Sequence, residues 1–409
     1  MRILIAAAGS RGDVAPYTGL GAGLREAGHD VALATTEAFA PLVREAGLDF
    51  RSLPTRPRTQ GGVEGKRELM RAAAAFVTEL GRGFADAVDD RTDLFLLSAT
   101  TAPLGWHVAE AMGIPTVGVH LQPNAPTGAF PPNVMGARSL GRLGNRVAGR
   151  LALRMADRVY TEAVTELRSR LDLPPLAPAE MRRRQERANR PVLHGFSTAL
   201  VPRPADWRAG LDVVGTWWPY VAPDRRLPAD VEDFLAAGSR PVFIGFGSMG
   251  SGHGERLSEL AVRALRRAGL RGILQSGSAG LAVAGDDVLT IGDVPHTLLF
   301  PRVAAVVHHA GASTAAAALR AGAPAIPVPV TADQPFWAAR LAAIGAATAP
   351  IPFASLTEER LADALGRAVR QQTYARAASV AAQHMATEDG VGAVLKALDW
   401  SSRPAPGPA

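Results

Sequence analysis

One short stretch of the chain, His308–Thr314, combines two histidines, small residues and two hydroxyl side chains. It follows the apolar run Val303–Val307 and precedes the alanine-rich stretch Ala315–Leu319, an order typical of a buried strand, a tight turn and the start of a helix. The first N–H groups of a helix have no intrahelical partner, and small residues let an anion approach them closely. The histidine and hydroxyl donors at the same turn therefore predict a site for a diphosphate.

A second polar pair, Asp333 and Gln334, follows the next apolar strand, Ala325–Val330. A carboxylate beside an amide offers both acceptors and donors, which is what a vicinal diol requires. We expect these two residues to hold sugar hydroxyls next to the diphosphate.

The loop Gly9–Val14 directly follows the first expected strand, Arg2–Ala8, and so lies at the mouth of any cleft at that end of the sheet. Its glycines permit a tight turn, which leaves Arg11 to neutralise a phosphate and Asp13 to take a proton. The structural alternative makes Asp13 the N-cap of a helix that begins near Pro16, with Arg11 as its surface ion pair.

Together these elements resemble the donor-binding signature of the GT-B nucleotide-sugar glycosyltransferases. The resemblance is to the bacterial natural-product and sterol-glucosyltransferase-like members of the UDP-glycosyltransferase superfamily, and it covers almost the whole chain. The loop Gly-Ser-Arg-Gly-Asp-Val matches that family residue for residue. The usual donor motif there is His-His-Gly-Gly-Ala-Gly-Thr, whereas this chain has Ala310 and Ser313 at two glycine positions. We expect these larger residues to tighten the phosphate turn.

The resemblance implies an inverting, metal-independent transfer of a hexose, with Asp13 as general base and His309 at the diphosphate. His308 is then a packing residue. The implied donor-binding residues are Ser10, Arg11, Ser248, Val294, His309, Gly311, Ser313, Thr314, Asp333 and Gln334. UDP-glucose and a dTDP-deoxysugar both suit these contacts as co-substrate, and no further cofactor is expected.

Two other motifs suggest different chemistry. Gly245–Gly250 fits the dinucleotide pattern G-x-G-x-x-G, but the next strand ends in Gln275-Ser276-Gly277, without the acidic residue that NAD requires. We therefore assign this loop to the nucleotide sugar, with Ser248 near phosphate, while plain loop packing stays the alternative. The adjacent His308 and His309 point in opposite directions at a strand end and lack a third ligand at zinc spacing, so no metal site is expected.

The acceptor side is less specific. Trp106, His120 and Phe130, with the amphipathic region Met135–Leu153, are candidates for an apolar pocket that binds a natural-product aglycone or a sterol, although such residues often only pack in a core. Two alternative functions share the fold: a sugar-nucleotide 2-epimerase, which needs several carboxylates around the sugar, and a catalytically silent auxiliary partner, expected to lack Asp13 or His309.

Composition limits the remaining classes of protein. The chain of 409 residues has a net charge of +6, but its arginines do not alternate with aromatic side chains, so no nucleic-acid partner is expected. The absence of cysteine excludes disulfides and thiol catalysis. The apolar N-terminal run ends at Gly9, too early for a signal peptide or a transmembrane segment, so we expect a cytoplasmic enzyme.

Strand-like and helix-like segments alternate along the chain, which predicts an α/β protein of two Rossmann-like, doubly wound domains facing each other across a cleft. Six strands are expected in the first half and five in the second. The expected segments are an acceptor-binding domain 1–215, an interdomain linker 216–240, a nucleotide-sugar-binding domain 241–386, a C-terminal helix 387–400 that crosses back to the first domain, and a disordered tail 401–409.

Overall fold

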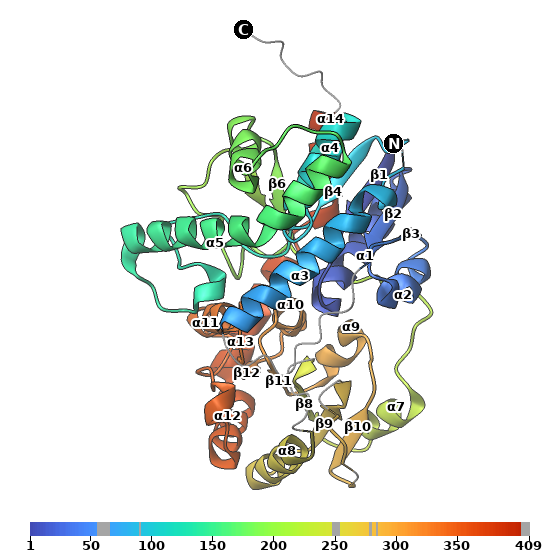
Figure 1. The fold of residues 1–409 in the computed structure, drawn as a ribbon. Coiled ribbons are helices and arrows are strands. Elements are labelled where there is room, and N and C mark those ends of the chain that lie inside the picture. Colours follow the sequence, from blue (N-terminus) through green and yellow to red (C-terminus); the bar gives the residue numbers. More distant parts are fainter. Residues whose placement is uncertain (55–65, 90, 248–253, 278–279, 284, 402–409) are drawn as a thin grey trace.

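The computed structural model describes residues 1–54, 66–89, 91–247, 254–277, 280–283 and 285–401. Figure 1 shows two α/β halves, one above the other, with the chain returning to the upper half at its end. Ser248 and the tail beyond residue 401 lie outside the described residues.

The upper half contains a parallel sheet that has seven strands in the described part of the chain, in the order β3-β2-β1-β4-β5-β6-β7. Its inner strands are almost wholly apolar and buried, as expected for a parallel sheet covered on both faces. The strands are β1 (Arg2–Ala6), β2 (Asp30–Thr35), β3 (Asp49–Ser52), β4 (Leu94–Leu97), β5 (Thr116–His120), β6 (Val192–His194) and β7 (Leu211–Val213).

The lower half repeats the architecture with a parallel sheet that has five strands among the described residues, in the order β10-β9-β8-β11-β12. These strands are β8 (Val242–Gly245), β9 (Gly272–Gln275), β10 (Val288–Ile291), β11 (Ala305–His308) and β12 (Ala325–Pro327). Both strand orders reverse direction next to the first strand of their half, which is the doubly wound topology. The predicted fold class is confirmed.

Helices cover both faces of each sheet (Figure 1). Those that follow strands of the first sheet are α1 (Arg11–Glu26), α2 (Ala40–Glu45), α3 (Lys66–Phe84), α4 (Ala102–Met112), α5 (Gly141–Arg170) and α6 (Pro178–Arg187). The remaining helices are α7 (Ala229–Ala236), α8 (Gly254–Ala268), α9 (His296–Leu299), α10 (Ala312–Arg320), α11 (Gln334–Ala343), α12 (Glu358–Arg370), α13 (Gln372–Met385) and α14 (Gly390–Ser401). Within the described residues, none of these helices has the length and apolar character of a membrane span.

Apolar contacts, in addition to the connecting chain, hold the two halves together. Val394 and Leu398 of α14 are buried in the core of the first half, against α1. A separate apolar cluster joins Phe196 and Trp207 of the first half to Trp337 of the second. Buried apolar area of this kind fixes the relative position of the halves and therefore the shape of the cleft between them. The expected boundaries of the five segments stay a prediction.

Three details differ from the sequence-based expectations. The first long helix begins at Arg11 instead of Pro16. The short strand β7 was not expected. The stretch expected to be a linker contains the helix α7, which places Val231 in the core of the second half.

Candidate active site

The predicted donor and base residues follow strands at the reversal points of the two sheets. Asp13 lies just after β1, which is flanked by β2 and β4. His309 follows β11, which pairs with β8 in parallel. In doubly wound sheets a crevice opens at the carboxyl ends of the strands where the strand order reverses. The topology thus brings Asp13 and His309 to the same cleft from opposite sides.

Asp13 is held by the first turn of its own helix. Its Oδ2 accepts hydrogen bonds from the Ser10 backbone N–H at 2.9 Å and from the Ser10 hydroxyl at 2.8 Å. Gly9 has φ +144°, and a Cβ there would lie 2.6 Å from the same Oδ2, so glycine is required for this turn. Among the described residues, the hydrogen-bond partner of the other oxygen, Oδ1, is Gln122 Nε2, at a long 3.5 Å. The contacts with Ser10 thus fix one oxygen and leave the second weakly bound.

The structural alternative, in which Asp13 is the N-cap of a helix that begins near Pro16, is wrong, because the helix begins at Arg11 and its N-cap is Ser10. Pro16 lies inside the helix, and because it has no N–H, the carbonyl of Gly12 four residues earlier loses its helical donor. That carbonyl instead accepts a hydrogen bond from Ser313 Oγ of the second half at 3.2 Å. One of the two residues that replace the usual glycines therefore makes a contact across the cleft.

Arg11 does not form the ion pair with Asp13 that the structural alternative requires. Its guanidinium lies 2.8 Å from the carboxylate of Asp293, in the segment after β10. Both side chains are more than half exposed, so water screens the pair and its contribution to stability is small. The pair is a second contact between the halves at the donor side of the cleft.

The predicted donor turn contains two histidines, of which His308 is fully buried and His309 is partly buried. Nδ1 of His308 accepts a hydrogen bond from the Ala310 backbone N–H at 3.1 Å, which supports its packing role. Burial lowers the pKa of His309 to about 4, so this ring is neutral at pH 7. Its Nδ1 is buried without a hydrogen-bond partner among the described residues. A buried, unpaired ring nitrogen is costly unless a ligand completes it.

Small residues make room for the His309 ring. A Cβ added at Gly247 would lie 2.9 Å from its Cε1, and one added at Gly311 would lie 2.5 Å from its Nε2. Gly311 is the N-cap of α10, and the helix begins at Ala312, so the first N–H groups of α10, including those of Ser313 and Thr314, face the turn without helical acceptors. Ala310 has φ +62°, a left-handed conformation in which its methyl group is strained.

Asp333 and Gln334 are adjacent, as expected, but both already have structural partners. Oε1 of Gln334 accepts from the Val330 and Thr331 backbone N–H groups at 2.8 and 3.2 Å. Oδ2 of Asp333 accepts from Trp337 Nε1 at 2.8 Å. Burial raises the pKa of Asp333, and the carboxylate of Asp13 across the cleft raises it further. The two carboxylates are therefore close enough to interact.

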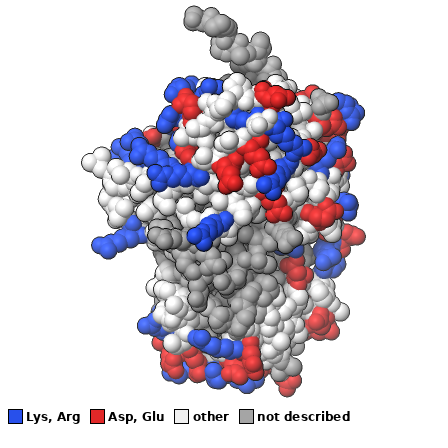
Figure 2. Space-filling view, in the orientation of Figure 1, with Lys and Arg blue, Asp and Glu red and all other residues white. Residues whose placement is uncertain are grey.

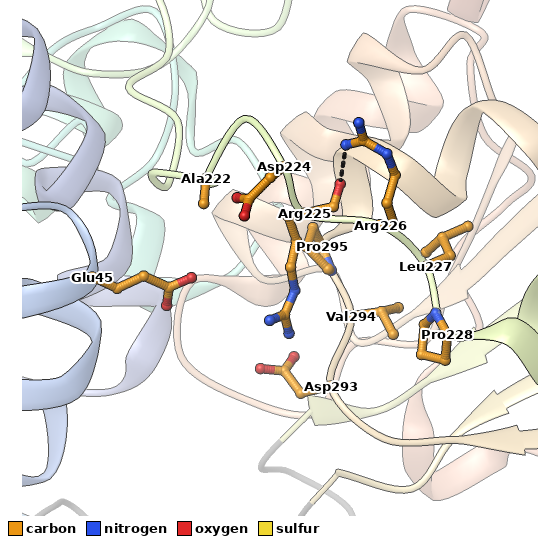
Figure 3. A pocket seen from close by; sticks show the side chains of 10 residues that line it. All are labelled: Glu45, Ala222, Asp224, Arg225, Arg226, Leu227, Pro228, Asp293, Val294 and Pro295. Atoms are coloured by element: carbon orange, nitrogen blue, oxygen red, sulfur yellow. Dashed lines mark hydrogen bonds between the residues drawn. The ribbon is translucent and has the colours of Figure 1, made fainter.

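A cavity of about 540 Å³ lies beside the segment that was expected to contact the nucleotide base. Figure 3 shows Val294 and Pro295 on one side of this cavity, Glu45 opposite, and the chain from Ala222 to Pro228 closing it. Val294 is buried, whereas Arg225 extends between Glu45 and Asp293 (Figure 3). The cavity is of the size that binds small molecules.

A second cavity, of about 330 Å³, contains all three predicted acceptor residues in its lining. Trp106 comes from α4, His120 from the end of β5, and Phe130 from the irregular segment that follows. Phe130 is nearly fully buried and also makes an edge contact with Phe336 of the second half at 5.4 Å, so it has a packing role as well. The lining is mostly apolar.

The wall behind His120 is a stack of buried rings. His120 meets His194 edge to face at 5.7 Å, and His194 lies flat on Trp207 at 4.6 Å. Burial lowers the pKa of His120 to about 4 and that of His194 to about 3. Both rings are neutral at pH 7, which keeps this wall apolar.

One carboxylate ties down the segment that carries Phe130. Asp206 accepts hydrogen bonds from Thr127 Oγ1, the Gly128 backbone N–H and Arg146 Nε, at 2.5, 2.8 and 2.8 Å. Burial opposes its ionisation, but these three donors outweigh burial and lower the pKa of Asp206 to about 2. The charged Asp206 thus fixes the irregular segment against α5.

Three contributions were missed by sequence reasoning. Gln122 contacts Asp13, and its place two residues beyond the end of β5 was the available signal. Asp206 organises the acceptor side from a loop that is distant in sequence, and Arg225 lines the cavity at Val294 from the expected linker. The sequence around Asp206 and around Arg225 contains no motif that predicts these roles.

Comparison with known proteins defines the class to which this arrangement belongs. Residues 3–90 match the glycosyltransferase family 28 N-terminal domain, and residues 274–398 match the erythromycin biosynthesis protein CIII-like C-terminal domain. The glycosyltransferase of kitacinnamycin has a similar structure, with a TM-score of 0.73 at 19% identity, covering 98% of this chain and 99% of the other.

Two relatives cover nearly the whole chain. O-mycaminosyltylonolide 6-deoxyallosyltransferase of Streptomyces fradiae is 37% identical over 98% of both chains. A sterol 3-beta-glucosyltransferase of Arabidopsis thaliana is 33% identical over 97% of this chain and 65% of its own length. The chain therefore belongs to the GT-B nucleotide-sugar glycosyltransferases of the UDP-glycosyltransferase superfamily, in the branch of bacterial natural-product and sterol-glucosyltransferase-like enzymes.

Proposed function

We propose that this glycosyltransferase is an inverting, metal-independent enzyme that moves a hexose from a nucleotide diphosphate sugar to a hydroxyl group of a small hydrophobic acceptor. The observation that carries the proposal is the contact between the helix of Asp13 and the turn of His309, where Ser313 Oγ donates a hydrogen bond to the Gly12 carbonyl at 3.2 Å. UDP-glucose and a dTDP-deoxysugar are the two donor classes, and a natural-product aglycone or a sterol is the acceptor class.

The base in this proposal is Oδ1 of Asp13. Its partner oxygen is occupied by Ser10, which fixes the orientation of the carboxylate. Oδ1 takes the proton of the acceptor hydroxyl while the acceptor oxygen bonds to the anomeric carbon and the bond from that carbon to the diphosphate breaks. Attack from the side opposite the leaving group inverts the anomeric centre.

The leaving diphosphate is received by the start of α10. Its unpaired N–H groups and the positive end of the helix dipole stabilise the negative charge that grows as the bond breaks. The His309 ring adds a donor, and Asp333 and Gln334 hold the sugar hydroxyls with the atoms that their structural partners leave free. The nucleotide extends toward Val294 and the cavity beside it.

The acceptor side of the proposal rests on the apolar cavity that contains Trp106, His120 and Phe130. The relatives agree in kind: the Streptomyces enzyme is named for transfer of a 6-deoxyallosyl group to O-mycaminosyltylonolide, and the plant enzyme for glucosylation of a sterol. Antibiotic or other natural-product biosynthesis is the corresponding biological role.

The direct test is incubation of the enzyme with UDP-glucose or a dTDP-deoxysugar and a panel of aglycones and sterols. We expect a glycoside whose anomeric configuration, measured by NMR, is opposite to that of the donor. A retained configuration would exclude the inverting mechanism. An epimerised nucleotide sugar formed without acceptor would indicate the 2-epimerase, and the absence of any turnover across the panel would indicate an auxiliary partner.

The metal-independent part has its own test. Activity should survive EDTA, because helix N–H groups and His309 take the place of a cation at the diphosphate. Loss of activity on chelation, restored by magnesium or manganese, would contradict this view of the leaving group.

A further inference from the structure

Apolar side chains gather on one exposed part of the surface. Eight large hydrophobic side chains are exposed among the described residues, and six of them lie between residues 134 and 151. These six, which we name the α5 stripe, are Val134, Met135, Leu140, Leu143, Val147 and Leu151. Leu143 is 77% exposed, more than any of the others. A concentration of this kind on one helix and its entry segment indicates a binding surface.

The part of the stripe that lies on α5 faces away from the acceptor cavity. On a helix with about 100° per residue, Leu143, Val147 and Leu151 share one face of α5, because they are four positions apart. The α5 residues that line the cavity, including Asn145 and Gly149, lie on the opposite face. Leu143, Val147 and Leu151 therefore cannot contact an acceptor bound in the cavity unless the helix rotates.

The charge around the stripe has a single sign. Residues 133–156 contain five arginines and no aspartate or glutamate. Arg146 pairs with Asp206, while the exposed Arg138, Arg142, Arg150 and Arg154 form no ion pair with any residue that the structure describes. Figure 2 shows this region as a pale lobe edged with blue at the left, where α5 begins in Figure 1. Apolar side chains beside unpaired arginines match the anionic headgroups and acyl chains of a membrane surface.

A second copy of this chain fits the stripe less well. In a two-fold dimer the same patch meets itself, so the four arginines would face four more without a carboxylate between them. An anionic lipid surface supplies both the negative charge and the apolar layer, and long arginine side chains can place their charge at the headgroups while their stems stay in apolar contact.

We infer that the α5 stripe docks this enzyme on anionic membrane surfaces. Val134 belongs both to the stripe and to the lining of the acceptor cavity, so docking places the cavity beside the membrane. That consequence rests on the proposed function: a hydrophobic acceptor dissolved in the bilayer would then have a short route to Asp13. The docking itself is independent of catalysis.

The test is co-sedimentation of the full chain with vesicles of equal parts phosphatidylcholine and phosphatidylglycerol, without sugar nucleotide or acceptor. We expect the wild type to bind these vesicles and to bind pure phosphatidylcholine vesicles at least roughly tenfold more weakly. The double variant Leu143→Glu/Val147→Glu should lose about tenfold or more of the binding, because it places charges in the apolar layer. Arg150→Gln/Arg154→Gln should weaken binding about tenfold and reduce its dependence on salt.

Val380→Glu is the matched control, since Val380 is 66% exposed but lies outside the stripe, and its binding should equal that of the wild type. Thermal unfolding of each variant checks that it folds. Three results would overturn the inference: no sedimentation of the wild type, equal loss in the Val380 and stripe variants, or a dimer seen by light scattering that becomes a monomer in the stripe variant while vesicle binding is absent. Equal loss in the Val380 and stripe variants would indicate a general effect of exposed apolar side chains. A dimer that the stripe variant dissociates would indicate a second copy of the chain as the occupant.

Discussion

The predicted donor turn and the cavity that contains the predicted acceptor residues belong to different halves of the molecule and are constructed differently. The donor turn consists of consecutive residues after β11, and its shape depends on the backbone: a left-handed Ala310, an N-cap at Gly311 and free N–H groups of α10. The acceptor cavity is assembled from side chains of α4, β5, α5 and an irregular segment, and Asp206 joins them from a distant loop.

The difference explains which specificity each side can carry. A diphosphate is the same in every nucleotide sugar, so a rigid backbone turn serves all of them. An aglycone varies in shape, and a wall of separate apolar side chains can change one residue at a time without disturbing the fold. We expect substitutions on the donor side to affect all substrates and those on the acceptor side to affect some.

The largest effect is expected at Asp13. Asp13→Asn keeps an oxygen that can accept the Ser10 hydrogen bonds, so the turn should persist, but the side chain can no longer take a proton. We expect kcat to fall by about 10²–10⁴ with every acceptor, while donor affinity changes little. Steady-state kinetics and calorimetric donor binding measure the two quantities.

The matched control for Asp13 is Glu26→Gln, which removes a carboxylate from the other end of the same helix. It should behave as the wild type. If Asp13→Asn turns over at nearly the wild-type rate, the base lies elsewhere, and His120 is the next candidate.

The second-largest effect is expected for His309→Ala, on donor binding. Loss of a hydrogen bond to a charged phosphate costs roughly 1.5–3 kcal/mol, which corresponds to about a ten- to hundredfold weaker donor binding. Calorimetry with the nucleoside diphosphate measures it without turnover. His308→Asn is the control, because the buried His308 supports the turn through Ala310 and should affect stability more than affinity. Unchanged donor affinity in His309→Ala would remove this residue from the site.

The ring stack behind the acceptor cavity predicts a pH effect. Burial lowers the folded-state pKa of His194 to about 3, whereas an unfolded chain has a histidine pKa near 6.5. Between these values the unfolded state binds a proton that the folded state does not, so the free energy of unfolding falls as the pH is lowered from about 6.5. One such site contributes a loss of about 1.4 kcal/mol between about pH 7.5 and 5.5.

Denaturant unfolding at the two pH values tests this effect. His194→Gln should reduce the loss of stability on acidification, whatever it does to stability at neutral pH. Equal pH dependence in His194→Gln and the wild type would show that His194 is not held neutral.

The smallest effect is expected at Ala310. Its left-handed conformation costs about 1–2 kcal/mol, and glycine removes that strain at the expense of greater freedom in the unfolded chain. We expect Ala310→Gly to raise the free energy of unfolding by about 0.5–1 kcal/mol. Ala312→Gly, two residues on and inside the helix, should lower it by a similar amount. If Ala310→Gly also destabilises, the methyl group contributes packing that outweighs the strain.

The same contrast decides how much could be predicted from the sequence. Apolar runs and turns are local signals, so eleven of the twelve strands in the described residues, apart from their exact ends, and the doubly wound class could be predicted from the order of such runs along the chain. The helix start at Arg11 was missed because a proline usually marks the first turn of a helix, whereas Pro16 is tolerated inside because Gly12 finds another donor. The strand β7 has only three residues, Leu211–Val213, too few to show a period.

Contacts between distant segments were not accessible in this way. The pair of Arg11 with Asp293 and the anchoring by Asp206 join residues whose neighbours in sequence give no indication of the partner. Trp106, His120 and Phe130 were suggested only by their types and positions after strands, and the cavity that unites them depends on the packing of α5.

Under the proposed function, the hydrogen bond from Ser313 to the Gly12 carbonyl makes donor binding an exchange of hydrogen-bond partners. A phosphate that recruits the Ser313 hydroxyl must take it from a main-chain carbonyl that Pro16 has left without a helical donor. The affinity gained at Ser313 is then the difference between two hydrogen bonds instead of the full value of one. Binding of the nucleotide sugar and release of this contact between the two halves are then thermodynamically linked at Ser313. A stronger hydrogen bond to Gly12 therefore lowers the affinity for the donor.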